Sequence, residues 1–235
     1  MLRSDRMKKV LVVIPAYNEA LSIEDVVADI KKNAPDADYV IVNDGSKDNT
    51  EEIVAKNGFN CINCFLNLGL FGAVQTGFLY ALENGYDIAI QFDGDGQHDA
   101  RYIKDLVKAV EDGANIAIGS RFVTERKPFT SRMIGSRLIA FAIFITTGKK
   151  IKDPTSGFRA YDRDVIDDYA LDMNNPPEPD TLVYMLRKKK KIKEVQVCMR
   201  EREFGESYLN LSNTIRYMSR MLISIMLIQP FRKVR

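Results

Sequence analysis

Two aspartates one residue apart, Asp93 and Asp95, are the strongest candidates for chemistry in this sequence. They follow an apolar run that ends at Phe92, so both carboxylates are expected in one small volume at the end of a buried strand. Like charges that close repel each other unless a cation lies between them. Carboxylate oxygens suit Mg²⁺ or Mn²⁺, which leave coordination positions open for substrate phosphates. The pair therefore predicts a divalent-metal site. The alternative is that the two side chains only organise a glycine-rich turn.

The elements that would position this pair alternate between strands and helices over the first 120 residues. Apolar runs predict strands at residues 10–14, 39–42, 60–66, 87–92 and 115–118, and helical patterns fill the segments between them. This alternation predicts an α/β fold, a mostly parallel sheet with helices on both faces. Ligands of such sheets bind beyond the carboxyl ends of the strands, which is where the two aspartates would lie.

Polar side chains follow other strands of the expected sheet as well. The segment after the first strand contains Pro15, Tyr17 and Glu19. Asp44 follows the second strand, where its carboxylate could accept hydrogen bonds from a base or a ribose, or cap the next helix. Asn67 and Gly69 stand at a helix start and allow close backbone approach, which suits either a ligand or tight packing. Several polar clusters at one edge indicate a binding site more than helix capping alone.

The composition is that of a folded globular protein, since 46% of the 235 residues are hydrophobic and 28% are charged. The net charge of +2 gives no reason to expect a nucleic-acid partner. Three cysteines, an odd number, argue against a disulfide framework and for a reducing compartment. The longest apolar runs, residues 138–147 and 221–228, are shorter than the ~20 residues that span a bilayer. We therefore expect a cytoplasmic protein that at most lies on the inner face of the membrane.

The last part of the chain differs in character from the rest. Between Ser207 and Arg235 there is no acidic residue, while five lysines and arginines stand among leucines, isoleucines and methionines. A helix of this kind could lie in a membrane interface with its arginines at the headgroups. Alternatively, it packs on the protein's own core or on a second copy of the chain in a homo-oligomer. The sequence thus predicts a main domain over residues 1–208 and a basic amphipathic helix over residues 209–235.

Seven short motifs occur in a fixed order along the chain. They are Pro15-Ala16-Tyr17-Asn18-Glu19, Asn43-Asp44-Gly45-Ser46, Asn67-x-Gly69, Asp93-Gly94-Asp95-Gly96-Gln97-His98, Gly119-Ser120-Arg121-Phe122, Asp153-Pro154-Thr155-Ser156-Gly157-Phe158-Arg159 and Arg200-Glu201-Arg202. This set resembles the family 2 glycosyltransferases of the GT-A fold, and more narrowly the dolichol- or polyprenyl-phosphate sugar synthases. The resemblance covers about residues 8–208, and it is more specific for the fold and a nucleotide-sugar donor than for the acceptor.

The resemblance implies a role for each matching residue. For the donor nucleotide, it implies a pocket lined by Pro15, Tyr17, Glu19, Asp44, Asn67, Gly69 and Asp93. It implies that Asp95, with Gln97 beside it, binds Mg²⁺ or Mn²⁺ on the donor diphosphate, where the metal stabilises the leaving group. For the acceptor, it implies a phosphate held by Arg121, Arg132, Ser136 and Arg202. Alternatively, Arg132 is a solvated surface charge and Arg202 pairs along a strand edge.

The activity that the resemblance implies is an inverting transfer of a hexose from a UDP- or GDP-sugar to polyprenyl phosphate. The chain departs from many such synthases because it lacks a transmembrane extension. Transfer to a sugar hydroxyl of a lipid-linked glycan or polysaccharide is the alternative, with Glu178, Asp180 or Asp153 as the general base. A non-catalytic nucleotide-sugar-binding partner of a membrane protein is a further alternative, against which the Asp93, Asp95 and Gln97 set argues. A sugar nucleotidyltransferase would need a glycine-rich basic loop after the first strand, which is absent.

Overall fold

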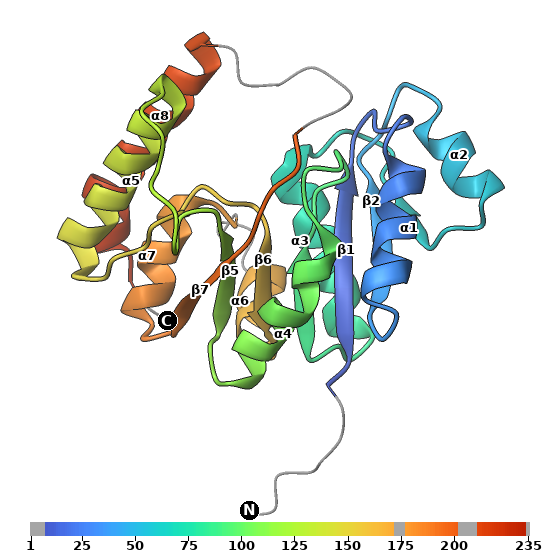
Figure 1. Ribbon diagram of the computed structural model, residues 1–235, viewed down its shortest axis with the longest axis horizontal. Coiled ribbons are helices and arrows are strands. Elements are labelled where there is room, and N and C mark those ends of the chain that lie inside the picture. Colours follow the sequence, from blue (N-terminus) through green and yellow to red (C-terminus); the bar gives the residue numbers. More distant parts are fainter. Residues whose placement is uncertain (1–7, 172–176, 202–210, 234–235) are drawn as a thin grey trace, which may run out of the picture.

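The computed structural model describes residues 8–171, 177–201 and 211–233, with the side chains of residues 131, 132 and 211–215 left aside. Within these ranges seven strands form one sheet (Figure 1). They are β1 (Val10–Ala16), β2 (Asp38–Asn43), β3 (Cys61–Asn63), β4 (Ile88–Gln91), β5 (Ile116–Ser120), β6 (Arg159–Asp162) and β7 (Ile192–Gln196). Their order across the sheet is β3-β2-β1-β4-β6-β5-β7. The predicted α/β fold is therefore confirmed.

Helices occupy the connections, as the alternating sequence pattern predicts. They are α1 (Ile23–Asn33), α2 (Thr50–Lys56), α3 (Gly69–Glu83), α4 (Ile103–Glu111) with the short η1 (Ala100–Tyr102) before it, α5 (Ser131–Thr147), α6 (Arg163–Leu171), α7 (Pro179–Arg187) and α8 (Leu211–Ile223). A π-helical turn, η2 (Ser224–Ile228), and a 3₁₀ turn, η3 (Gln229–Phe231), continue α8. Parallel neighbours need such crossovers, because a hairpin cannot join two parallel strands.

Only β6 among these strands runs against its neighbours. It is antiparallel to β4 on one side and to β5 on the other, while β1, β2, β3, β4, β5 and β7 share one direction. The carboxyl ends of the six parallel strands therefore meet at one edge of the sheet. The loop that precedes β6 reaches β6 from that same edge, because the strand runs the opposite way. The sequence pattern did not predict this strand.

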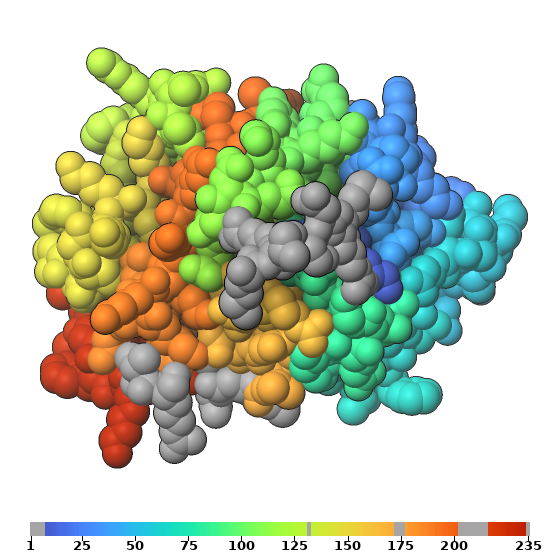
Figure 2. Space-filling view, turned by 90° about the horizontal axis from the view of Figure 1, so that it is seen from below, coloured from blue at the N-terminus to red at the C-terminus, as the bar shows by residue number. Residues whose placement is uncertain are grey.

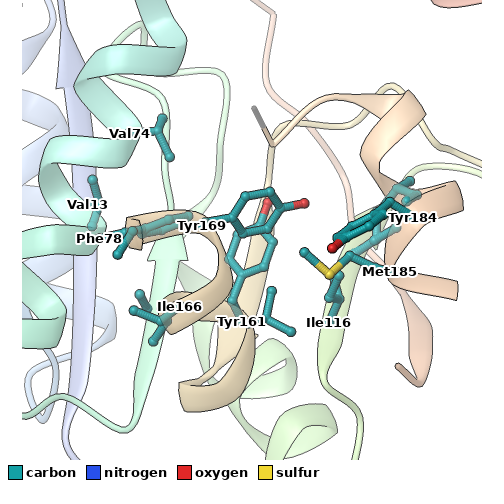
Figure 3. Packing of buried hydrophobic residues seen from close by; sticks show 14 of the residues in the cluster. Val13, Val74, Phe78, Ile116, Tyr161, Ile166, Tyr169, Tyr184 and Met185 are labelled. Carbon is teal, nitrogen blue, oxygen red and sulfur yellow. The ribbon is translucent and has the colours of Figure 1, made fainter. Parts of the chain in front are cut away.

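The core consists of two apolar layers, one on each face of the sheet. Alternate residues of β1 point to opposite faces: Leu11 and Val13 pack with α3, α5, α6 and α7, whereas Val12 and Ile14 pack with α1 and α4. Figure 3 shows the first layer, where Phe78, Tyr161 and Tyr169 meet edge to face or tilted. α3 approaches β1 closely at Gly77, where a Cβ would lie 2.1 Å from Cγ1 of Val13. A larger side chain at this position would push α3 off the sheet.

The C-terminal helix packs on the rest of the protein with one side only. Met221 and Ile225 are fully buried in the same cluster as Ile139 and Ile143 of α5. Figures 1 and 2 show α5 and the tail side by side at one end of the molecule. In the described ranges no helix has both the length and the apolar character needed to cross a bilayer. The domain boundary at residue 208 lies outside the described residues and stays a prediction.

Candidate active site

The segments that follow β1 and β4 lie against each other at the carboxyl edge. Gly94 packs on the first segment: a Cβ there would lie 3.0 Å from the carbonyl oxygen of Pro15 and 3.5 Å from Cγ of Glu19. Ser22 Oγ donates to the carbonyl oxygen of Gly94 over 2.7 Å and does not cap α1. Although Ser22 stands where a capping box is expected, its hydroxyl instead anchors the loop that carries the two aspartates.

The loops after β1 and β2 are also tied together. The backbone N–H of Asn18 donates to Ser46 Oγ over 3.0 Å, and Asn18 Oδ1 accepts from the N–H of Lys47 over 2.8 Å. Asn18 has φ 58°, in the left-handed region that asparagine tolerates better than most residues. Next to it Tyr17 is 41% exposed at the rim of this edge, where its ring is free to stack on a planar group.

His98 orients Asp93. The N–H of Asp93 donates to Nδ1 of His98 over 2.9 Å, so this ring nitrogen carries no proton. The protonated Nε2 then lies 3.6 Å from Oδ2 of Asp93. The imidazole also stacks on the ring of Phe158, with centroids 4.8 Å apart, which fixes its plane. The one histidine of the chain therefore supports the loop of residues 93–98, which we call the acidic loop.

The oxygen atoms around Asp95 fit a hard divalent cation. The N–H of Gln97 donates to Oδ1 of Asp95 over 3.1 Å, and Asp95 lines a cavity of about 260 Å³. Nearby, Gln91 Nε2 lies 3.4 Å from Oδ1 of Asp93, and Gln91 Oε1 is buried without a partner among the described residues. Carboxylate and amide oxygens are the ligands that Mg²⁺ and Mn²⁺ prefer. No three His, Cys, Asp or Glu side chains of the described ranges are grouped to hold a metal, so ligand phosphates would have to complete the coordination.

Asp44 is buried beneath the loop that precedes α3. Its Oδ1 accepts from the N–H of Leu68 over 2.7 Å, and the N–H of Gly69 donates to Oδ1 of Asn67 over 3.1 Å. Gly45 has φ +67°, and a Cβ there would lie 3.1 Å from the nitrogen of Asn67, so a side chain at this position would be strained and crowded. Removal from water raises the pKa of Asp44, although the N–H groups of Leu68 and Gly69 act in the opposite direction.

This raised pKa predicts that Asp44→Asn stabilises the free protein at neutral pH. A carboxyl whose folded pKa is raised binds its proton more tightly in the folded state, so it favours folding at low pH and opposes it once ionised. Asparagine keeps an oxygen for the N–H of Leu68 without the buried charge. We expect a higher unfolding midpoint than wild type at about pH 7 and a gain that disappears towards about pH 4. Thermal unfolding across this range is the measurement, with the exposed Asp36→Asn as control; a gain independent of pH contradicts the assignment.

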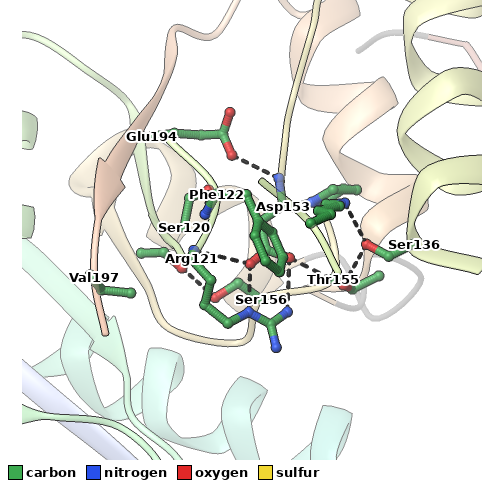
Figure 4. Close-up of polar contacts among 12 residues, drawn as sticks. Ser120, Arg121, Phe122, Ser136, Asp153, Thr155, Ser156, Glu194 and Val197 are labelled. Carbon is green, nitrogen blue, oxygen red and sulfur yellow. Dashed lines mark hydrogen bonds and ion pairs between the residues drawn. The ribbon is translucent and has the colours of Figure 1, made fainter. Parts of the chain in front are cut away.

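Arg121 is held at the edge of the sheet by Asp153 (Figure 4). Arg121 Nε and Nη2 donate to Oδ2 and Oδ1 of Asp153 over 2.8 and 3.0 Å, and the N–H of Arg121 donates to Oδ2 over 3.2 Å. Asp153 is fully buried, and its own N–H donates to Oε1 of Glu194 over 2.8 Å. Paired charge-assisted bonds of this kind fix orientation as well as charge. The guanidinium is therefore positioned, and Asp153 balances most of its charge.

Ser136 projects from α5 into the same group of residues. Its buried Oγ accepts from Nζ of Lys127 over 2.9 Å and lies 3.2 Å from Oγ1 of Thr155. Thr155 Oγ1 in turn lies 3.3 Å from Oδ1 of Asp153. Residues 153–155 thus connect Ser136 to Arg121. These are two of the four residues expected from the sequence to hold the acceptor phosphate.

Residues 153–158 join the two halves of the site. The beginning of this loop contacts Arg121 and Ser136, as described above, while Gly157 lies against the acidic loop. A Cβ at Gly157 would lie 3.1 Å from Oδ2 of Asp93 and 3.3 Å from Nε2 of Gln91. Only a residue without a side chain leaves the Asp93 carboxylate in place here. The acidic pair and the cationic group are therefore two ends of one site.

A buried arginine holds this loop in shape. Arg159 is 1% exposed, and its guanidinium donates to the carbonyl oxygens of Ser156 (2.8 Å), Pro154 (2.7 Å) and Pro177 (3.1 Å). These bonds tie the loop to the segment that leads into α7. Because three carbonyl oxygens satisfy the buried charge, the loop cannot move without exposing an unpaired guanidinium.

Some predicted residues are not placed by the structure. Arg202 lies outside the described residues, and so does the side chain of Arg132. The carboxylates considered as a general base all have structural partners: Glu178 accepts from Arg220 over 2.8 Å, and Asp180 Oδ2 accepts from Ser224. Desolvation raises the pKa of Glu178, although Arg220 acts in the opposite direction. These contacts give no support to transfer onto a sugar hydroxyl.

Sequence reasoning missed three residues of this site. Lys127 lies in a basic loop that has no periodicity, and only the fold shows that its ammonium reaches Ser136. Gln91 stands inside an apolar strand, where nothing marks it as a neighbour of Asp93. Arg159 ends one of the seven motifs, so its position in that motif was a usable signal.

Comparisons with known proteins agree with this geometry. The family model Glycosyl transferase family 2 matches residues 11–170. Undecaprenyl-phosphate mannosyltransferase of Micrococcus luteus is 31% identical over 214 residues, which cover 86% of this chain and 88% of that protein. Polyprenol monophosphomannose synthase of Mycolicibacterium smegmatis is 29% identical over 220 residues, which cover 88% and 83%.

Solved structures show the same fold. A crystal structure of glucosyl-3-phosphoglycerate synthase from Mycobacterium tuberculosis, in complex with Mn²⁺, UDP and phosphoglyceric acid, superposes with a TM-score of 0.68. The match covers 96% of this chain and 80% of that one at 17% identity, and it confirms the GT-A fold. Since the family model spans more than half of its residues, this chain is a glycosyltransferase and belongs to glycosyl transferase family 2.

Proposed function

We propose that this chain transfers a hexose from a UDP- or GDP-sugar to a polyprenyl phosphate, with inversion at the transferred carbon. Relatives that match most of the chain are named as transferases to undecaprenyl phosphate or polyprenol. The observation that carries the proposal is the loop of residues 153–158, which places a cationic, hydroxyl-bearing group next to an acidic metal-binding group. A phosphate acceptor and a diphosphate donor would need these two environments at one site.

The donor would bind along the carboxyl edge of β1, β2 and β4. In this proposal its nucleotide contacts Pro15, Tyr17, Glu19, Asp44, Asn67, Gly69 and Asp93. Asp95 and Gln97 hold Mg²⁺ or Mn²⁺ on the diphosphate, and the metal neutralises charge that develops on the leaving nucleoside diphosphate. The carboxylate of Asp95 at the cavity of about 260 Å³ supports this assignment.

The acceptor needs no general base, because its phosphate is already an anion. A phosphate oxygen attacks the anomeric carbon, the carbon–oxygen bond to the diphosphate breaks, and no proton has to move. Arg121, Arg132, Ser136 and Arg202 would bring that oxygen into line with the donor, and correct alignment supplies much of the rate.

The test is a comparison of acceptors. Purified protein with Mg²⁺ or Mn²⁺ is given UDP- and GDP-hexoses together with either farnesyl phosphate or a neutral oligosaccharide, and release of nucleoside diphosphate is followed. We expect release to depend on farnesyl phosphate and Arg132→Ala to lose far more activity than Asp180→Asn. Release driven by the oligosaccharide, or by neither acceptor, contradicts the proposal.

We also propose that the protein lies on the membrane through an apolar face formed by α5 and the tail. We define this face by its exposed residues Ile134, Leu138, Phe141, Ile145, Ile223, Leu227, Ile228 and Phe231. The opposite sides of the same helices are buried in the core, so folding leaves this face without cover from the described part of the chain. Apolar patches of this kind on a surface helix mark a membrane or protein contact.

Charges on the apolar face are expected to abolish membrane binding. The variant Phe141→Glu with Leu227→Glu places two carboxylates at positions that are 61% and 65% exposed. We expect it to stay in the supernatant when vesicles containing phosphatidylglycerol are sedimented, and to keep its activity on farnesyl phosphate in detergent. Leu171→Glu, at a position 71% exposed on α6, is the control and should sediment like wild type. A double variant that still sediments with vesicles, or a wild type that elutes as a dimer through this face, contradicts the membrane role.

A further inference from the structure

Lys127 is a cation that is not among the four residues proposed to bind the acceptor phosphate. It lies in the loop between β5 and α5, partly buried, with Nζ 2.9 Å from Oγ of Ser136 and 5.2 Å from the ring centroid of Phe122. The loop is fixed behind it, because Arg137 Nη2 donates to the carbonyl oxygen of Lys127 over 2.6 Å. The ammonium is thus aimed at the hydroxyl of Ser136 by the backbone as well as by its own hydrogen bond.

The charge of Lys127 is poorly balanced. Among the described residues it forms no ion pair with a carboxylate, and its hydrogen-bond acceptor is a neutral hydroxyl. Arg121 lies on the same side of the site and Arg137 lies behind the loop, whereas Asp153 and Glu194 face it from the neighbouring segments. Burial first, and then the two arginines, lower the pKa of Lys127, although the two carboxylates act in the opposite direction. An anion beside the ammonium would relieve this imbalance.

Arg121, in contrast, already has its anion. Both of its donating nitrogens and its backbone N–H are bound to the buried carboxylate of Asp153. Turning the guanidinium toward a ligand would leave that carboxylate unpaired in the interior, which is costly. Lys127 can turn toward a ligand at the cost of one bond to a hydroxyl.

We propose that Lys127 and Ser136 form the phosphate-binding pair for the acceptor, with the Lys127 ammonium supplying the charge that Arg121 gives to Asp153. The inference rests on the proposed function, adds Lys127 to the residues that bind the acceptor, and gives Arg121 a positioning role in place of direct contact with the phosphate. The phosphate monoester accepts from Nζ of Lys127 and from the hydroxyl of Ser136, while Arg121 keeps the 153–158 loop in place. The hydrogen bond from Nζ of Lys127 to the phosphate then contributes to the affinity for the acceptor, and Lys127 does not contact the donor.

Four variants test this pair in detergent with farnesyl phosphate as the acceptor. We expect Lys127→Met to raise the acceptor KM about 10- to 100-fold, the range that the loss of a charged hydrogen bond predicts, and to leave the donor KM unchanged. Ser136→Ala should raise the acceptor KM less, and Lys127→Arg should restore most of it. The matched control is Lys31→Met, since Lys31 lies 5.2 Å over the ring of Phe59 at the opposite edge of the sheet. Calorimetric titration with farnesyl phosphate alone should repeat the order of affinities.

A pH series separates charge from shape. Because the pKa of Lys127 is lowered, wild type should lose acceptor affinity as pH rises through the alkaline range, earlier than an ordinary lysine would, whereas Lys127→Arg should keep it over this range. The second phosphate ionisation, with a pKa near 6, is complete at these pH values and does not interfere.

Three results would overturn the inference. If wild type uses farnesyl phosphate and Lys127→Met has the same acceptor KM, Lys127 does not bind the acceptor, and the proposed function stands. If Lys127→Met instead loses only its binding to phosphatidylglycerol vesicles, the ammonium serves lipid headgroups. If inorganic phosphate protects wild type and Lys127→Met equally against thermal unfolding, Lys127 does not contribute to phosphate binding. Failure of wild type itself to use farnesyl phosphate is a failure of the proposed function.

Discussion

Asp95→Asn is expected to reduce sugar transfer by about 10²- to 10³-fold with little change in stability. Asp95 is partly exposed and its proposed role is to hold the metal on the diphosphate, so loss of its charge removes transition-state stabilisation of several kcal/mol. The asparagine oxygen can still accept from the N–H of Gln97, which keeps the loop folded. The measurement is kcat at saturating donor and acceptor, over a series of Mg²⁺ and Mn²⁺ concentrations.

A second readout shows that the effect arises at the metal. With wild type, nucleoside diphosphate and metal together should raise the unfolding midpoint, because a ligand specific for the folded state stabilises it. Asp95→Asn should lose the metal-dependent part of that shift. Asp25→Asn is the matched control, since Asp25 lines the same cavity and is fully outside the acidic loop. Equal activity of Asp95→Asn and wild type at every metal concentration would rule out the proposed metal site.

Asp153→Ala is expected to destabilise the protein by about 3–5 kcal/mol, the usual result of removing one partner of a buried ion pair. The substitution leaves the guanidinium of Arg121 without its carboxylate and removes the acceptor for the N–H of Arg121. For a chain of this size that corresponds to a decrease of roughly 10 °C in the unfolding midpoint. Thermal or denaturant unfolding measures it, and transfer activity should fall as well, because Thr155, whose hydroxyl contacts Ser136, loses its acceptor on Asp153.

The comparison for this prediction is an exposed ion pair. Asp112 lies 3.7 Å from Lys108 on α4 with both side chains well exposed, and such pairs contribute at most about 1 kcal/mol. Asp112→Ala should therefore change the midpoint little. If Asp153→Ala and Asp112→Ala have the same unfolding midpoint, the buried Arg121–Asp153 pair does not stabilise the protein more than an exposed ion pair does.

Most of the fold is readable from the sequence because its strands are buried on both faces. The apolar runs at 10–14 and 87–92 coincide with β1 and β4, and the polar motifs that begin at Pro15, Asn43, Asp93 and Gly119 lie at the carboxyl ends of β1, β2, β4 and β5. Burial on both faces demands continuous aliphatic residues, and that demand leaves a strong local signal. The approach of the acidic pair to Pro15 and Glu19 was predictable from this placement, whereas the bond from the N–H of Leu68 to Asp44 was not.

Other features depend on contacts between distant segments and leave no local signal. β6 has four residues, Arg159–Asp162, and pairs with two strands that are more than 40 positions earlier in the chain. The Ser22 hydroxyl matches a helix cap in sequence, yet it binds the carbonyl oxygen of Gly94. Lys127 approaches Ser136 because α5 packs beside the 153–158 loop, a tertiary contact that periodicity does not encode.

The position of β6 between β4 and β5 also sets the order in which a newly made chain can become an enzyme. While the ribosome is still adding residues before β6, β4 has no partner on the edge that faces β5, and β5 has no partner at all among the described strands, since β7 is made later still. Long-range pairing of this kind is slow and exposes unpaired edges until it is complete. The strand that joins β4 to β5 is directly preceded by the loop of residues 153–158, which contacts both Asp93 and Arg121 through its own residues. A truncated chain that ends before this loop would therefore lack both the joined sheet and the link between the two halves of the site.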